Sequence, residues 1–390
     1  MRILVSLIGA WLVTTAPFAF AQDKPIKIGF VSSFSAATAL LGNSMRDGFE
    51  LGLDHLGRKM AGRPVEVIYE DDQVKPEVGL QKTRKLIESD KVDFISGYIW
   101  SNVLLPSLKP IVDSNTLLVV SMAGPSQFAG ELCSPYVFSA SWQNNQIPQA
   151  MGTYLNQQHV KRLLLIGPNY TGGKDMLSGV KNTFTGDIVD EMYTRWPDQF
   201  DFSAELSKVN AVKPDAVFVF YPGTSGVQFL TQYSQNGLKN QIPLYTVFTI
   251  DELGLPVQKD LALGVPGVNA WVNDLPNDSN KRFVADYKKK YNAAPSYYAA
   301  LSYDSATMID AAVETVGGDL TRKDEMRRHL EASGFASVRG PLKFGNNHIP
   351  IQNMYLQTPV KQPDGSIALK TTDTIVKNDQ DLFHDKCSIK

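Results

Sequence analysis

The 390-residue chain is predicted to fold into two α/β lobes, each built on a doubly wound parallel sheet. Short, nearly continuous apolar runs alternate with helical segments, which is typical of parallel strands buried on both faces. This alternation runs from residue 26 to about residue 125 and starts again at residue 162. The chain is also too long for one ordinary hydrophobic core. Two similar units are therefore expected.

The first block contains four expected strands, over residues 26–31, 65–69, 93–97 and 116–121. In the helix after the first strand, Met45, Phe49, Leu53 and Leu56 recur at helical spacing and share one face. A second helix is expected over 76–89, with Pro76 in the first turn, where proline is well tolerated. A third helix is expected to end near residue 113.

The second block contains expected strands over 162–166, 187–193, 215–220 and 243–248. Its helices are expected from about residue 174, over 202–209 and over 226–237. A strand at 268–272 follows, then helices over 278–291, 297–316 and 323–332, and a short extended segment at 340–344. Residues 354–358 and 367–372 are expected to pair as a hairpin around Gln362-Pro363-Asp364-Gly365.

The N-terminus has the features of a secretory signal. Arg2 precedes an apolar run over residues 3–13, and Ala19-Phe20-Ala21 provides the small residues that a signal peptidase recognises. Cleavage is expected after Ala21, which places the mature protein in the periplasm. Since the apolar run is shorter than a membrane span, a permanent anchor is the weaker interpretation.

Composition and motifs argue against several classes of function. The chain has 38 Lys and Arg against 40 Asp and Glu, and no basic block that would bind nucleic acid. The five histidines are scattered, so neither a metal nor a cofactor is expected, and Glu70-Asp71-Asp72 is interpreted as capping a turn. No nucleophile with a matching base is found, so the protein is not expected to be an enzyme; a secreted hydrolase is the weakest hypothesis.

Cys133 and Cys387 are the only cysteines. An isolated pair in an oxidising compartment usually forms a disulfide, so this bond is predicted. Two separate thiols remain the alternative, because the sequence does not give the distance between them. The last dozen residues are polar and are expected to form a loose tail unless Cys387 holds them.

Aromatic residues lie at or near the ends of the expected strands, where open α/β sheets bind ligands. Small or hydroxyl residues stand beside them, which would let backbone N–H groups approach an anion. Ordinary packing is an equally good explanation for each aromatic residue alone, but the recurrence favours a binding site. The aromatic residues are Phe34, Trp100, Tyr170, Tyr221 and Phe248, and the small ones are Ser35, Ser101, Ala123, Gly124, Thr171, Gly223 and Thr249.

In the order and spacing of its segments, the chain resembles the type I periplasmic solute-binding proteins of ABC importers, in the branched-chain amino acid-binding group. The matching segments are IKIGFVSSFSAATALLGNSMRDGFELGLD, VIYEDDQVKPEVGLQKTRKLI, DFISGYIWSN, LLVVSMAG, KPDAVFVFYPG, FVADYKKKYNAAPSYYAALSYDS and GPLKF. The resemblance implies crossovers near 142–145, 271–274 and 343–345, which form a three-strand hinge. It implies a first lobe over 22–143 and 274–343, a second over 144–273 and 344–376, and a tail over 377–390.

The same resemblance implies how a ligand is held. The loops at Ser101 and at Ala123-Gly124 would bind a carboxylate from the first lobe, and loops 170–172, 221–223 and 248–251 would close from the second. Amino-acid-binding members carry an acid just after the strand at 244–248, but this chain has Thr249 there and Asp251 two residues later. Trp100 and Trp142 add aromatic bulk. Because a buried ammonium needs a carboxylate partner, an aromatic or aliphatic acid is at least as well favoured as leucine.

The leading hypothesis is therefore a monomeric binding protein that closes on a small carboxylate and delivers it to an ABC permease. The ligand-binding subunit of a sensor or receptor system is the alternative, since such systems use the same fold.

Overall fold

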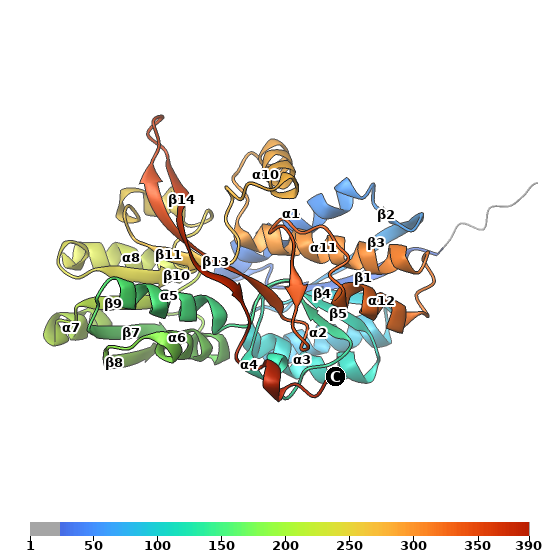
Figure 1. Cartoon of the computed structure of the whole chain (residues 1–390), viewed down its shortest axis with the longest axis horizontal. Coiled ribbons are helices and arrows are strands. Elements are labelled where there is room, and N and C mark those ends of the chain that lie inside the picture. Colours follow the sequence, from blue (N-terminus) through green and yellow to red (C-terminus); the bar gives the residue numbers. More distant parts are fainter. Residues whose placement is uncertain (1–23, 390) are drawn as a thin grey trace, which may run out of the picture.

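The structure is a computed structural model that describes residues 24–389. It consists of two lobes that lie side by side along the long axis of the molecule (Figure 1). Each lobe contains one sheet with helices on both faces, which confirms the predicted fold class. The signal predicted over residues 1–21 lies outside the described residues.

The first sheet has six strands in the order β2-β3-β1-β4-β5-β6. All neighbouring pairs are parallel except β2 with β3. The strands are β1 (Ile26–Ser32), β2 (Lys59–Met60), β3 (Arg63–Asp71), β4 (Phe94–Gly97), β5 (Leu117–Val120) and β6 (Val137–Ser139).

Two helix pairs cover this sheet, on opposite faces (Figure 1). One pair is α2 (Pro76–Glu88) with α3 (Ser101–Asp113), and the other is α1 (Ala39–His55) with α11 (Tyr297–Thr315). The second pair packs very closely, because a Cβ at Gly48 would lie 2.0 Å from the Ala299 carbonyl oxygen. Shorter or peripheral helices complete the lobe: α4 (Ser126–Ala129), α10 (Asp278–Tyr291) and α12 (Lys323–Glu331).

The second sheet has the order β12-β13-β11-β10-β9-β7-β8, with β14 paired to β13. Its strands are β7 (Arg162–Pro168), β8 (Asp187–Thr194), β9 (Ala216–Phe220), β10 (Leu244–Val247), β11 (Gly267–Asn269), β12 (Lys343–Phe344), β13 (Pro350–Lys361) and β14 (Ile367–Asp379). Its helices are α5 (Gln146–Gln157), α6 (Thr171–Thr183), α7 (Ser203–Val212), α8 (Thr224–Gln235) and α9 (Leu255–Gln258).

Strand alternation divides the core of this lobe into two parts. Leu163 and Leu165 of β7 belong to the cluster that contains α5 and α6, whereas Leu164 and Ile166 belong to the cluster that contains α7 and α8. Successive side chains of a strand point to opposite faces, so a sheet covered on both sides needs apolar residues at every position. This requirement explains why central strands such as β7 and β9 were recognisable as continuous apolar runs.

The chain passes between the sheets three times: after β6, after β11 and between α12 and β12. Close to these crossings, the buried Arg339 side chain makes bonds from all five of its N–H groups. It donates to Asp304 Oδ2 from Nε and Nη2 (both 3.2 Å), to the Ser141 carbonyl (3.1 Å) and Gln352 Oε1 (2.7 Å) from Nη1, and to the Ala140 carbonyl (2.5 Å) from Nη2. Arg339 thus joins α11, β13 and the segment that enters the first crossing.

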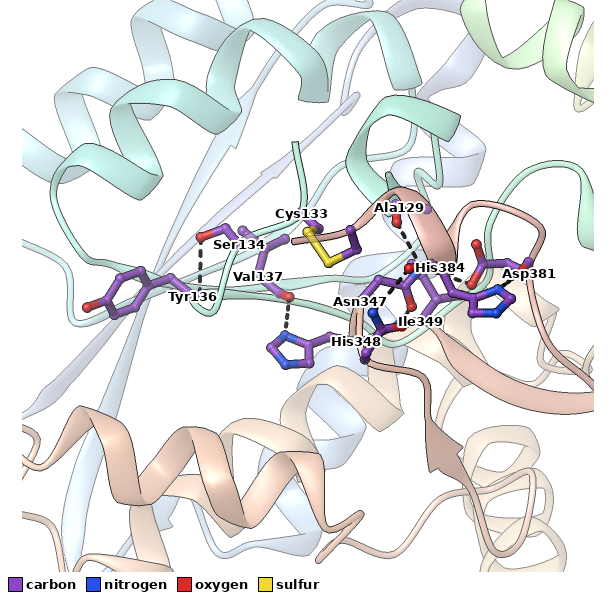
Figure 2. Close-up of a disulfide and its surroundings, with 12 residues drawn as sticks. Ala129, Cys133, Ser134, Tyr136, Val137, Asn347, His348, Ile349, Asp381 and His384 are labelled. Atoms are coloured by element: carbon purple, nitrogen blue, oxygen red, sulfur yellow. Dashed lines mark hydrogen bonds between the residues drawn. A yellow bond between two sulfur atoms is a disulfide. The ribbon is translucent and has the colours of Figure 1, made fainter. Parts of the chain in front are cut away.

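A disulfide joins the C-terminal segment to the first lobe, as predicted. Cys133 and Cys387 are bonded with their Cα atoms 5.6 Å apart, although 254 residues separate them in the sequence. Figure 2 shows that polar contacts flank the bond, including those from Asn347 Nδ2 to the Ala129 carbonyl (2.8 Å) and to Asp381 Oδ2 (2.9 Å). The last residues are therefore held against the first lobe.

Helix α5 is absent from the sequence-based predictions. Gly152 lies in the middle of this helix, where glycine weakens a helical pattern, and Pro148 lies in the first turn, where proline is tolerated. The tertiary structure requires a small residue at position 152, because a Cβ there would lie 2.4 Å from Thr183 Oγ1 in α6. The predicted hairpin at 354–358 and 367–372 is also too short, since β13 and β14 extend over Pro350–Lys361 and Ile367–Asp379.

Two further features bear on function. None of the helices within residues 24–389 is long and apolar enough to cross a membrane.

The acidic cluster at 70–72 forms its contacts within the protein. Glu70 pairs with Lys82 and Lys85 (both 2.7 Å), and Asp71 accepts a hydrogen bond from the backbone N–H of Phe34 (2.9 Å).

Candidate functional site

A small cavity of about 30 Å³ lies between the two lobes. Segments that follow the strands of both sheets line it, together with the first crossing and the start of α11. The lining residues are Ile99, Trp100, Ser101, Met122, Trp142, Asn144, Tyr170, Gly172, Met176, Phe220, Pro222, Phe248, Tyr297 and Tyr298.

Aromatic rings from both lobes meet at this cavity. Trp142 stacks on Phe248, with ring centroids 4.9 Å apart and an interplanar angle of 17°. Phe248 also lies 4.9 Å from the ring of Tyr297. On the other side, Trp100 meets Tyr170 edge to face at 6.1 Å. Each of these pairs joins a ring from the first lobe to a ring that follows a strand of the second sheet. The walls of the cavity are therefore formed only when the lobes are together.

The Trp100 ring is held from behind by a chain of hydrogen bonds. Its indole Nε1 donates to Ser33 Oγ (2.8 Å), and the Ser33 hydroxyl donates to the buried carboxylate of Asp72. Asp72 also accepts the backbone N–H of Val74 (2.8 Å). Burial raises the pKa of Asp72 to about 6. These contacts fix the orientation of one wall of the cavity.

The polar part of the cavity lies at the N-terminus of α3, where Asn144 connects several groups. Its Nδ2 donates to Ser101 Oγ (3.0 Å) and to Asp175 Oδ2 (3.1 Å), and its Oδ1 accepts the backbone N–H of Gly124 (3.2 Å). Asp175 also accepts the backbone N–H of Ser126 (3.2 Å), so this network links the two lobes. Burial raises the pKa of Asp175.

The first N–H groups of α3 are available to an anion. Ser101 and Asn102 are the first two residues of this 13-residue helix, and the initial N–H groups of a helix have no intrahelical acceptor. The helix dipole adds partial positive charge at the same end. A carboxylate placed beside Ser101 would therefore find donors without a basic side chain.

Among the described residues, no acidic or basic side chain lines the cavity. The nearby acid, Asp251, is buried and accepts the backbone N–H groups of Leu253 (3.0 Å) and Gly254 (2.7 Å) through Oδ1. Burial raises the pKa of Asp251 to about 6. The cavity wall thus offers hydrogen-bond donors and rings but no charge partner for an ammonium group.

Comparison with known proteins identifies the architecture. The model of a family described as periplasmic binding protein matches residues 25–365. The chain belongs to this family. A curated relative, Leu/Ile/Val-binding protein homolog 6 of Brucella melitensis, is 26% identical over 371 residues, which are 92% of this chain and 93% of the relative. The predicted resemblance to the branched-chain amino acid-binding group is confirmed.

Two solved structures are similar over almost their whole length. One is a solute-binding protein of an ABC transporter from R. palustris in complex with benzoate, which is 29% identical with a TM-score of 0.87 and covers 93% of this chain and 99% of its own. The other is a solute-binding protein of an ABC transporter from Rhodopseudomonas palustris BisB5 in complex with 3,4-dihydroxy benzoic acid, at 27% identity and a TM-score of 0.85, covering 92% and 99%. These relatives are binding proteins, which confirms that this family member is not an enzyme.

Half of the residues predicted for the site lie in the cavity lining. These are Trp100, Ser101, Trp142, Tyr170 and Phe248. The other five lie outside the lining, and in each case the structure shows what the residue contacts instead.

Tyr221 and Thr249 belong to the interior of the second lobe. The Tyr221 ring packs against Phe202 and Phe229, and its hydroxyl is bonded to Thr194 Oγ1 (2.9 Å). Thr249 Oγ1 accepts the backbone N–H of Tyr221 (2.9 Å). Both residues therefore stabilise the sheet that carries the site.

Phe34, Ala123 and Gly124 lie outside the lining in the first lobe. Phe34 packs edge to face on Tyr69 at 5.8 Å. The backbone N–H of Ala123 donates to the Tyr98 carbonyl (2.9 Å), and that of Gly124 donates to Asn144, as described above. A Cβ at Gly124 would lie 2.1 Å from the Trp142 carbonyl oxygen, so a larger residue would displace the first crossing.

The sequence-based prediction missed Phe220, Asn144, Tyr297 and Tyr298. Phe220 could have been found from alternation: Phe218 and Phe220 share one face of β9, whereas Val219 and Tyr221 share the other. Tyr297 and Tyr298 were assigned only to a helix. Their position directly after the Pro295-Ser296 start of α11 was the available signal, because helix ends are where side chains reach a cleft.

Proposed function

We propose that this protein captures an aromatic carboxylate between its lobes and delivers it to the permease of an ABC importer. The observation that carries the proposal is the composition of the cavity wall. It contains seven aromatic side chains and, among the described residues, no charged one. Flat rings give large apolar contact area to an aromatic body. The seven are Trp100, Trp142, Tyr170, Phe220, Phe248, Tyr297 and Tyr298.

In this proposal the ligand carboxylate binds at the N-terminus of α3. Ser101 Oγ and the first N–H groups of the helix are donors of the kind that a carboxylate accepts from, and Asn144 Nδ2 holds Ser101 Oγ in place by donating to it (3.0 Å). An α-ammonium group would be desolvated without a carboxylate in the wall, which costs free energy. The site therefore favours an acid without an amino group over leucine.

The relatives support the same ligand class. The two similar R. palustris structures contain benzoate and 3,4-dihydroxy benzoic acid, each of which combines a ring with a carboxylate. The Brucella melitensis relative is named for leucine, isoleucine and valine, so these amino acids are the alternative ligands to test. No observation favours the sensor-subunit hypothesis.

Binding requires the lobes to move apart and close again. The cavity of about 30 Å³ is far smaller than the cavity of about 150 Å³ that accommodates a benzene ring. We propose hinge movement at the predicted crossovers 142–145, 271–274 and 343–345, between the predicted lobes at 22–143 with 274–343 and 144–273 with 344–376. We further propose that the protein acts as a monomer in the periplasm after removal of residues 1–21.

A thermal-shift panel tests the proposed ligand class. We expect benzoate and its derivatives to raise the melting temperature, because a ligand at one hundred times its Kd adds about 2.7 kcal/mol of stability. Leucine, isoleucine and valine should give no shift at the same concentrations. Stabilisation by these amino acids with no response to benzoates would contradict the proposed ligand class, but not the family assignment.

A further inference from the structure

One polar atom of the cavity lacks a partner. Tyr297 is 2% exposed, and its hydroxyl oxygen has no hydrogen-bond partner among the described residues. Tyr297 lines the cavity, and its ring is surrounded by those of Trp142 (6.1 Å), Phe248 (4.9 Å) and Tyr298 (4.2 Å). A buried hydroxyl that is left unpaired costs free energy, and such a group in a native structure calls for an explanation.

We infer that the Tyr297 hydroxyl hydrogen-bonds a ring hydroxyl of the ligand, so that the protein prefers hydroxylated aromatic acids to unsubstituted ones. This inference rests on the proposed function, because it concerns the same cavity. A phenol both donates and accepts, and so does a tyrosine hydroxyl, so the two can pair in either direction. Burial raises the pKa of Tyr297 well above its ordinary value, which keeps the proton on its hydroxyl.

The ligand carboxylate has its own donors elsewhere in the cavity wall. Ser101 lines the cavity and is the first residue of α3, where its hydroxyl and the first N–H groups of the helix can donate to an anion. A carboxylate bound there leaves the Tyr297 hydroxyl for a second polar substituent of the same ligand.

Tyr303 of the same helix provides a matched control. Its hydroxyl is bonded to His55 Nδ1 at 2.9 Å, and it does not line the cavity. Tyr297→Phe and Tyr303→Phe therefore each remove one hydroxyl group from α11. The Tyr297 hydroxyl has no partner among the described residues, whereas the Tyr303 hydroxyl is bonded to His55. Tyr303→Phe should lower the melting temperature of the unliganded protein, whereas Tyr297→Phe should leave it unchanged or raise it, since an unpaired hydroxyl is removed.

Calorimetric titration with benzoate, 3-hydroxybenzoate and 4-hydroxybenzoate tests the inference. We expect the wild type to bind at least one hydroxybenzoate about tenfold more tightly than benzoate, which is the gain of about one hydrogen bond. Tyr297→Phe should abolish this preference, and Tyr303→Phe should retain it.

Three results would overturn the inference, and they have different meanings. Equal affinity of the wild type for benzoate and both hydroxybenzoates would reject the role of Tyr297 while leaving the proposed function intact. An equal loss of affinity for all three acids in Tyr297→Phe would show that Tyr297 contributes packing or binds the carboxylate itself. If none of the three acids binds the wild type, the proposed function fails, and the inference fails with it.

Discussion

The network around Arg339 and Asp304 near the crossings and the cavity wall both contain buried polar groups, but only the Arg339–Asp304 network pairs all of its members within the described residues. Near the crossings, the five N–H groups of Arg339 each have an acceptor, and Asp304 accepts from Ser337 and Val338 as well as from Arg339. In the cavity, the Tyr297 hydroxyl has no partner among the described residues. Burial costs free energy unless a polar group is paired.

The Arg339–Asp304 network and the cavity therefore have different roles. A fully paired buried network stabilises one arrangement of the chain, whereas an incompletely paired one gains its partner only when another molecule binds. Substitutions at the hinge should therefore change stability, and substitutions in the cavity should change affinity. The following variants test that division.

The largest effect is expected from Asp304→Asn. This change leaves the Arg339 guanidinium buried without its counter-charge, and removal of one partner of a buried pair costs about 3–5 kcal/mol. Urea unfolding should show this loss. As a control, Asp113→Asn disrupts an exposed pair with Lys109 and should cost less than about 1 kcal/mol. Equal losses in the two variants would show that the hinge network does not stabilise the fold as we describe.

A smaller effect, on affinity, is expected from Ser101→Ala. The variant loses the hydroxyl that we place beside the ligand carboxylate, and a hydrogen bond to a charged group contributes about 1.5–3 kcal/mol. Benzoate should bind about 10- to 100-fold more weakly in calorimetry. Ser114→Ala, at the opposite end of α3, should leave the affinity unchanged. A similar change in both variants would argue against binding at the start of α3.

The smallest effect is expected at Asp251, whose buried carboxyl group is only half paired. Its Oδ1 accepts two hydrogen bonds, whereas its Oδ2 has no partner among the described residues. Burial raises its pKa to about 6, above the value of about 3.9 in an unfolded chain. The folded protein therefore binds the Asp251 proton more tightly than the unfolded chain does. This adds to the free energy of unfolding at low pH, and the added stability is lost as the pH rises through about 6. Between pH 5 and pH 8 the wild type should lose about 1 kcal/mol more stability than Asp251→Asn.

Urea unfolding of both proteins at these two pH values measures this difference. Asp260→Asn, a neighbouring exposed position, should follow the wild type. If Asp251→Asn also changes in parallel with the wild type, the carboxyl group does not titrate as its burial implies.

The sequence predicted the central strands well, because strands that are covered on both faces, such as β7 and β9, must be apolar at nearly every position. It did not predict the short strands β2 and β6 at the edges of the first sheet. It did not predict α5, since Gly152 in the middle of that helix weakens the local pattern and close packing on α6 compensates for it. Local propensity and tertiary packing disagree in this helix, and only the structure reveals the packing.

The site was predicted only in part, for a related reason. Most of the loops that the resemblance implied do line the cavity, but the resemblance did not determine which of two adjacent residues faces it. Phe220 faces it and Tyr221 faces the α7 and α8 core, although both are aromatic residues at the end of the same strand. Tyr297 reaches the cavity through its contact with Phe248, a residue about 50 positions earlier in the sequence. The periodicity of a sequence contains no information about such contacts.

A crystal structure of the protein with benzoate tests the central claim most directly. We predict one benzoate between the lobes, with its carboxylate at the N-terminus of α3 beside Ser101 and its ring between the side chains of Trp142, Phe248 and Trp100. Benzoate found outside this cavity, or a bound amino acid whose ammonium is held by Asp251, would contradict the account.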